Sequence, residues 1–146
     1  MAEYDHQQAG RAYGANNRNS GAAWLSGDVI GFVVSFSDGA APLCITGDTV
    51  WYDGVAEVAR RFRPAAILLF AGSARTRSPF NLTMDANDAI ETAHAFPNAM
   101  IVPIHRDSWA HFTQNAKDLE DSFKALGIAS RLLILEPGVP TPITAS

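Results

Sequence analysis

The sequence has one cysteine, few charged residues and no long apolar run. Only 18% of the 146 residues are charged, and the net charge of −4 offers no basic surface for nucleic acid or an anionic membrane. The single cysteine, Cys44, has no intrachain partner and sits in an apolar stretch, so we expect a small buried side chain. No apolar run approaches the ~18 residues of a membrane span, and the amino terminus lacks a signal pattern. We therefore expect a cytoplasmic protein that binds neither nucleic acid nor membrane.

What is present is a regular alternation of short apolar runs and amphipathic stretches. Hydrophobic residues make up 47% of the chain, which is ordinary for a folded α/β protein of one domain. The apolar runs have the length of buried strands and cover residues 29–36, 42–46, 65–70, 99–104 and 131–135. Helical patterns fall at about 54–62, with Asp53 as cap, at 83–95, with Thr83 as cap, and at 116–126. The order predicts an α/β layered sheet.

Composition divides the chain into three segments. Residues 1–28 are rich in Gly, Asn, Ala and Ser, show no periodicity, and are typical of a loop-rich amino-terminal segment. Residues 29–138 carry the strand and helix patterns. Residues 139–146 form a Pro-rich tail with no packing signal. Within the first strand pattern, Gly31 indicates a bulge or a close backbone contact.

The first candidate site is Thr46-Gly47-Asp48-Thr49, which closes a short apolar run and precedes a helix pattern. The loop places Asp48 at the carboxyl end of a strand, where open α/β sheets bind their ligands. Gly47 allows the backbone to approach whatever Asp48 contacts. The alternative is that Asp48 is an ordinary residue of a turn or of the approach to a helix.

A second stretch repeats this arrangement. Residues 99–105 are an apolar strand pattern that ends in His105. An Asp and a His delivered from two strands to the same edge of a sheet can build a metal site on a rigid scaffold. Imidazole and carboxylate ligands together suit zinc, manganese or iron.

Three stretches carry a resemblance to a known family: TGDTVWYDGVAEVARRFRP at 46–64, LTMDANDAIETAHAF at 82–96 and MIVPIHRDSWAHF at 100–112. Together they resemble the carboxyl-terminal half of a metallo-β-lactamase-fold hydrolase, in its lactonase-like branch. The resemblance covers roughly residues 29–138. It implies half of a four-layer αββα sandwich, a mixed sheet with helices on one face.

The resemblance also implies a chemistry. In that family the Asp of Gly-Asp-Thr bridges two metal ions, which corresponds to Asp48, and a His after a Pro-bearing strand ligates the second ion, which corresponds to His105. The metals, zinc by this resemblance with manganese or iron as alternatives, activate a water that attacks an ester, lactone, amide or phosphoester of a small molecule. Asp48 would then be catalytic as well as a metal ligand.

One departure from the family pattern is large. The family's amino-terminal half carries a His-x-His-x-Asp-His motif that supplies most of the metal ligands, and this sequence has none. Its four histidines are His6, His94, His105 and His111. His6 resembles a further family ligand at the end of a strand; the alternative is a terminal histidine with no role. His94 is expected to be structural.

Other positions are candidates for substrate contact. Trp51, Arg75 and Trp109 are candidate substrate-binding residues, with core packing or a solvent-exposed loop as their alternatives. His111 lies in a loop that resembles one folding over the family's metals, so it is a candidate proton donor. Asp85 resembles a residue bordering the site, although a carboxylate at a helix start needs no such role.

Several functions remain open at this level. The chain is either an incomplete metal-dependent hydrolase, whose partner is a complementing amino-terminal half or a second copy of itself, or a fragment that folds poorly because one sheet face is exposed. A third hypothesis is a non-catalytic, self-associating module with a vestigial metal site. A small-molecule or phosphate-binding α/β protein is a fourth, weakened by the missing Gly-rich phosphate motif.

Overall fold

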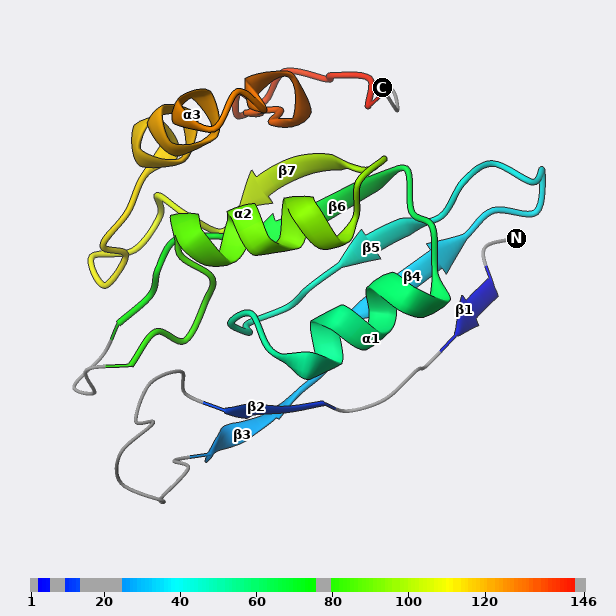
Figure 1. Ribbon diagram of the computed structural model, residues 1–146, viewed down its shortest axis with the longest axis horizontal. Helices are drawn as coiled ribbons and strands as arrows, with labels where there is room; N and C mark the ends of the chain where they lie inside the picture. Colours follow the sequence, from blue (N-terminus) through cyan, green and yellow to red (C-terminus); the bar gives the residue numbers. More distant parts are fainter. Residues whose placement is uncertain (1–2, 6–9, 14–24, 76–79, 144–146) are drawn as a thin grey trace.

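The computed structural model describes residues 3–5, 10–13, 25–75 and 80–143 (Figure 1). Its main sheet has five strands in the order β1-β4-β5-β6-β7. β4 runs antiparallel to both β1 and β5, whereas β5, β6 and β7 are parallel. The bounds of these strands are β1 Glu3–Asp5, β4 Phe32–Ser35, β5 Leu43–Ile45, β6 Ala66–Phe70 and β7 Met100–Ile104. A separate antiparallel pair joins β2 Gly10–Tyr13 to β3 Leu25–Val29.

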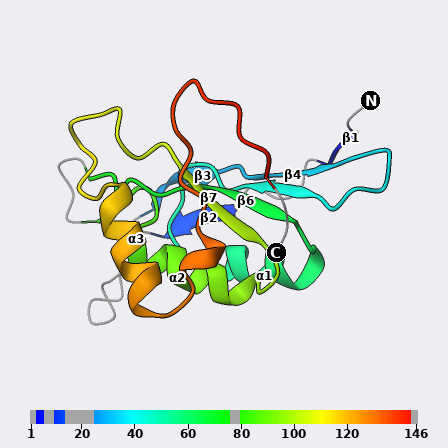
Figure 2. The same cartoon turned by 90° about the horizontal axis from the view of Figure 1, so that it is seen from above.

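Three α-helices lie on one face of this sheet, with the carboxyl-terminal segment arching over the other (Figure 2). They are α1 Asp53–Arg61, α2 Ala86–Ala95 and α3 Ala116–Ala125, and a 3-10 helix, η1 Ala129–Arg131, follows. The predicted fold class, a mixed sheet with helices on one face, is confirmed. Parallel strands need crossover connections, and α1 and α2 supply them between β5, β6 and β7.

The hydrophobic core lies between the sheet and the helices. Strand pairing aligns Val33, Cys44, Ile67 and Ile101 in one row across four strands, and all four belong to the core. Cys44 is buried as expected. From the helix side, the fully buried apolar side chains of α3 and of the segment before α2 are Leu119, Phe123 and Met84. Burial of this apolar surface is the main favourable term in folding.

The opposite face of the sheet, called the outer sheet face below, is also apolar. Because side chains alternate along a strand, the rows on either side of the core row point away from the helices. They comprise Val34, Leu43, Ala66 and Met100, then Phe32, Ile45, Leu68 and Val102, then Phe70 and Ile104. Ala66 and Val102 are buried, Phe32 is exposed, and the other members are half-buried. A face with this composition is typical of sheets covered on both sides.

The structure differs from the sequence-based expectation at both ends of the chain. Residues 1–28, expected to be loop, include β1, β2 and most of β3. The expected strand at 131–135 is replaced by η1 and a single bridge between Ile101 and Leu132. The strand expected at 29–36 is interrupted at Gly31, where a Cβ atom would lie 2.9 Å from the carbonyl oxygen of Ile45. The predicted close backbone contact at Gly31 is therefore confirmed.

Helix caps also differ from expectation. The N-cap of α2 is Asp85, which accepts from the Asp88 N–H, because the Thr83 hydroxyl is taken by the Ala74 N–H. The N-cap of α1 is Tyr52, without a side-chain cap, and Asp53 is the first helical residue. α3 is followed by Gly127, which has a φ of 71°, and the Ile128 N–H donates to the Phe123 carbonyl, which is the usual glycine-ended helix stop. Leu126, the last residue of the helical pattern at 116–126, is 53% exposed.

We predict that Arg131→Met lowers the free energy of unfolding by about 2 kcal/mol, because hydrogen bonds from a charged donor are worth more than neutral ones. The Arg131 guanidinium donates to the carbonyls of Ala93, Phe96 and Ala99 at 2.5–2.7 Å, around the end of α2. The matched control is Arg63→Met, whose exposed guanidinium donates to carbonyls at the end of α1 and should change stability by less than about 0.5 kcal/mol. Urea denaturation measures both; equal losses would contradict the prediction.

Among the helices of the described residues, none combines the length and the apolar character needed to cross a membrane.

Candidate metal centre

Asp48 and His105 meet at the carboxyl edge of the sheet, as the sequence predicted. Asp48 follows β5 and His105 follows β7, and the two strands flank β6. The Asp48 Oδ1 atom lies 3.6 Å from the His105 Nε2 atom. That separation is too long for a good hydrogen bond. The His105 side chain is 35% exposed and the Asp48 side chain 63% exposed, so both reach solvent.

The loop that carries Asp48 is fixed by backbone geometry. Gly47 has a φ of 68°, and a Cβ atom there would lie 2.5 Å from the carbonyl oxygen of Ile30. Only glycine fits such a position. The hydroxyl of buried Thr46 accepts from the Phe70 N–H at 3.1 Å, which ties the end of β5 to the end of β6. The chain therefore leaves β5 along one path, and Asp48 lies at the sheet edge.

His105 is held in an unusual conformation between two aromatic rings. Its φ of 52° is in the left-handed region, which costs a non-glycine residue roughly 1–2 kcal/mol. Its imidazole centroid lies 5.0 Å from the ring of Phe70 and 5.0 Å from that of Phe112. Backbone strain of this kind is often found at functional sites.

A polar network fixes the neighbouring loops. Ser73, also left-handed with a φ of 47°, donates its N–H to the Met84 carbonyl at 2.9 Å. The Thr113 hydroxyl donates to the Ser73 carbonyl at 2.8 Å. The Gln114 side-chain oxygen accepts from the first N–H of α2, that of Ala86, at 2.7 Å. These contacts join the loop after β6, the start of α2 and the loop after β7.

The other candidate residues differ in what they contact and in how exposed they are. The His111 ring contacts the Phe112 ring edge to face, with their centroids 4.9 Å apart, and the ring of Trp109, which is 61% exposed, has its centroid 6.0 Å from that of His111. Arg75 is exposed and donates from Nε to the Asn81 side chain. Trp51 packs against the hydrophobic core. His94 is exposed on α2, and His6 lies outside the described residues.

Asp88 connects α2 to the loop that follows Asp48. Its carboxylate accepts the backbone N–H of Trp51. Burial raises the pKa of Asp88 to about 6, and the nearby Asp85 carboxylate contributes to that rise. The link was not expected from the sequence, in which Asp88 has the pattern of an ordinary first-turn acid.

The Asp48–His105 geometry fits two ligands of one divalent ion. Zn–N and Zn–O bonds of 2.0–2.2 Å in a tetrahedron separate the two donor atoms by about 3.4 Å. The observed 3.6 Å is close to this value. Within the described residues no group of three or more His, Cys, Asp or Glu side chains is placed to hold a metal ion. This part of the chain therefore offers two ligands, one fewer than catalytic zinc sites normally use.

Two features of the site were not found from the sequence. Phe70 and Phe112 enclose His105, and Gly72 is packed so tightly that a Cβ atom would lie 2.6 Å from Phe112 Cδ1 and 2.8 Å from the His105 carbonyl oxygen. Phe112 falls inside the stretch that resembles the hydrolase family, which was the one available signal. Nothing in the local sequence marks Gly72 as a contact of a residue so far along the chain.

Comparison with known proteins finds similarity to proteins described as metal-dependent hydrolases. No protein-family model matches the chain. UPF0173 protein YddR of Bacillus subtilis is 30% identical over 125 residues, which cover 86% of this chain and 49% of that protein. A UPF0173 metal-dependent hydrolase of Carboxydothermus hydrogenoformans is 27% identical over 128 residues, 87% of this chain and 51% of that protein. The chain thus spans about half the length of the curated relatives it matches.

This chain also matches only about half of the length of similar solved structures. An isothiocyanate hydrolase from Delia radicum gut bacteria has a TM-score of 0.74 and 28% identity, covering 82% of this chain and 46% of its own. A possible metal-dependent hydrolase from Veillonella parvula has a TM-score of 0.71 and 27% identity, covering 77% and 43%. Igni18, a metallo hydrolase from Ignicoccus hospitalis, has a TM-score of 0.64 at 18% identity, covering 94% and 50%. The chain has the α/β fold of metallo-hydrolases and is similar to about half of each of these proteins.

Proposed function

We propose that this chain supplies Asp48 and His105 to the metal centre of a metal-dependent hydrolase. The observation that carries the proposal is their approach to 3.6 Å at the carboxyl edge of the sheet, in a chain similar to proteins named metal-dependent hydrolases. We propose zinc as the metal, because a carboxylate and an imidazole are zinc ligands. When bound, the metal would lower the pKa of a water molecule and polarise the group under attack.

The remaining ligands have to come from elsewhere. His6 follows directly after β1, which pairs with β4, and we propose it as a third ligand. Further ligands would come from a second half-domain packed on the outer sheet face. Two observations support this: the outer sheet face is apolar, and the relatives are about twice as long as this chain. Sheets that pack face to face bury such surfaces in one core.

Other steps of the reaction would depend on residues of this chain. We propose that Asp48 orients the attacking water, and that His111 donates a proton to the leaving group. Trp109, 61% exposed beside His111, would contact the substrate, together with Arg75 and Trp51 from the two other loops. We propose an ester, lactone or phosphoester substrate, as in the lactonase-like branch. An isothiocyanate is a second substrate class, because one similar structure is named an isothiocyanate hydrolase.

A non-catalytic role is the competing proposal. It is favoured by the presence of only two suitably placed ligands among the described residues. In that case the outer sheet face would serve self-association, and Asp48 and His105 would be a vestigial site. The two proposals differ in whether metal-dependent turnover appears once a second half is supplied.

Zinc titration calorimetry on the chain alone tests the metal site. We expect weak 1:1 binding that is reduced at least about 10-fold in His105→Ala and in Asp48→Asn, since each removes one of two ligands. The matched control is His94→Ala, which removes an exposed histidine on α2 and should leave the affinity within about twofold. Equal affinities in all four proteins would overturn the proposed site.

A chimaera tests the activity. The half of Bacillus subtilis YddR that this chain does not match would be joined to it, and the product assayed with a lactone, an aryl ester, an aryl phosphodiester and an isothiocyanate. We expect zinc-dependent turnover of at least one substrate, reduced at least about 100-fold by His105→Ala, because losing an outer partner of a ligand alone costs 10- to 100-fold. A folded, zinc-loaded chimaera without turnover would favour the non-catalytic role.

A further inference from the structure

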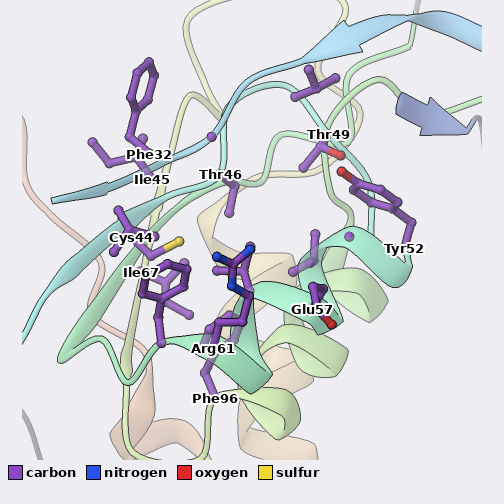
Figure 3. A pocket seen from close by; sticks show the side chains of 17 residues that line it. Phe32, Cys44, Ile45, Thr46, Thr49, Tyr52, Glu57, Arg61, Ile67 and Phe96 are labelled. Carbon is purple, nitrogen blue, oxygen red and sulfur yellow. The ribbon is translucent and has the colours of Figure 1, made fainter. Parts of the chain in front are cut away.

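A cavity of about 100 Å³ lies between α1 and the underside of β4 and β5 (Figure 3). Its lining is mostly apolar, with Val55, Val58 and Phe62 on the α1 side, Cys44 and Ile67 on the sheet side, and Phe96 from the segment after α2. A water molecule needs only ~10–15 Å³ by this measure, so the cavity accommodates a larger occupant. It lies on the helix side of the sheet, and two members of the outer sheet face, Phe32 and Ile45, also border it.

The cavity carries one cation at its wall. Figure 3 shows Arg61 reaching from α1 toward the underside of the sheet, and Thr46 and Cys44 line the same cavity from the sheet side. Within the described residues no carboxylate pairs with Arg61, whose guanidinium carbon lies 5.5 Å from the centroid of the Phe62 ring. Glu57, which also lines the cavity, is bonded instead to the Nε of Arg60 at 2.9 Å. One guanidinium therefore remains for an anion.

The shape of the cavity selects a class of ligand. Its lining runs along α1 from Gly54 to Arg61, a span of roughly 10 Å at 1.5 Å per residue. An apolar channel with a single cation at one end complements a molecule with an alkyl chain and one negative charge. A planar guanidinium binds a carboxylate through two parallel hydrogen bonds, whereas a neutral head group would leave it unpaired.

We propose that the cavity beneath α1 binds an aliphatic monocarboxylate of medium chain length, with its carboxylate on Arg61 and its alkyl chain among Cys44, Phe62 and Phe96. The cavity is distinct from the metal centre: its lining reaches Thr46 and Thr49, on either side of Asp48 in the sequence, but includes neither Asp48 nor His105.

Titration calorimetry of the full chain with octanoate, below its micellar range, tests the charge. We expect saturable 1:1 binding that Arg61→Gln weakens at least 10-fold. The matched control is Arg60→Gln, one residue earlier on the same helix, which pairs with Glu57 on the surface and should leave the affinity within twofold. Loss of equal size in both variants, or no saturable binding by the wild type, would overturn the proposal.

A chain-length series tests the apolar channel. From butanoate to octanoate, each added methylene is expected to tighten binding about fourfold, the ratio that corresponds to burial of one CH₂. Cys44→Leu should reduce octanoate affinity by filling the cavity, with its fold checked by thermal melting. If that variant does not fold, the series still decides: an affinity independent of chain length would mean that the cavity is not the site. Because octanoate is titrated without metal, failure here leaves the proposed hydrolase function untouched.

Discussion

Gly72→Ala is expected to destabilise the fold by about 3 kcal/mol, near the upper end for overpacking a tight site. An alanine Cβ at this position would lie 2.6 Å from Phe112 Cδ1 and 2.8 Å from the carbonyl oxygen of His105. Neither contact is tolerable without movement, and one of the two atoms belongs to backbone. The variant should therefore also shift His105 and weaken the zinc affinity of the chain. Urea denaturation and zinc calorimetry measure the two effects.

The effect of Gly72→Ala can be separated from a general loss of glycine. Gly39→Asn is the matched control, because Gly39 has a φ of 80°, a Cβ atom there would have no neighbour within 4 Å, and Asn tolerates this conformation. We expect that control to cost less than about 1 kcal/mol. The double variant Gly72→Ala/Phe112→Leu should recover part of the lost stability, since it removes one of the two clashes. A Gly72→Ala protein as stable as the wild type would refute the contact.

The sequence predicted elements whose signal is local. The run at 65–70 is continuously apolar and forms β6, and the amphipathic stretch after Thr83 forms α2, because periodicity and length are sufficient for such elements. β1 and β2 have three and four residues, too few to show a period. The cap of α2 could not be chosen either, because Thr83 and Asp85 are both capping residues and only the tertiary contact with Ala74 assigns the Thr83 hydroxyl elsewhere.

The candidate site, like the fold, has some features that the sequence predicted and others that it did not. Asp48 and His105 were predictable because each follows an apolar strand pattern, and the carboxyl ends of parallel strands meet at one edge. The packing of Phe70 and Phe112 around His105 depends on how the loop after β7, which carries Phe112 and the left-handed His105, folds back over the end of β6. Propensity disfavours that conformation for histidine, so no pattern-based argument would have placed it there.

The stability of the protein should depend on pH through Asp88, which lies between α2 and the loop after Asp48. Burial raises the pKa of Asp88 from its ordinary 3.8 to about 6. Because the folded pKa is the higher one, the folded state binds the proton more tightly than the unfolded state between these values. The contribution of Asp88 is therefore most favourable below pH 3.8, falls as pH rises toward 6, and is constant above that. The two pKa values differ by about 2 units, which corresponds to about 3 kcal/mol.

Asp88→Asn is accordingly expected to be more stable than the wild type at pH 7, by about 2–3 kcal/mol, and nearly equal to it at pH 4. The amide oxygen of asparagine still accepts the Trp51 N–H, so the link to the loop after Asp48 is kept while the buried charge is removed. Glu91→Gln, which removes an exposed carboxylate on the same helix and the smallest of the contributions that raise the Asp88 pKa, is the control and should show a much smaller pH-dependent difference. Denaturant midpoints at several pH values between 4 and 7 measure the difference between each variant and the wild type.

A gain for Asp88→Asn that is the same at every pH would mean that packing, rather than the buried charge, sets the effect. A loss at pH 7 would mean that the ionised carboxylate binds the Trp51 N–H strongly enough to outweigh its desolvation, and that the charge itself holds the Asp48 loop in place.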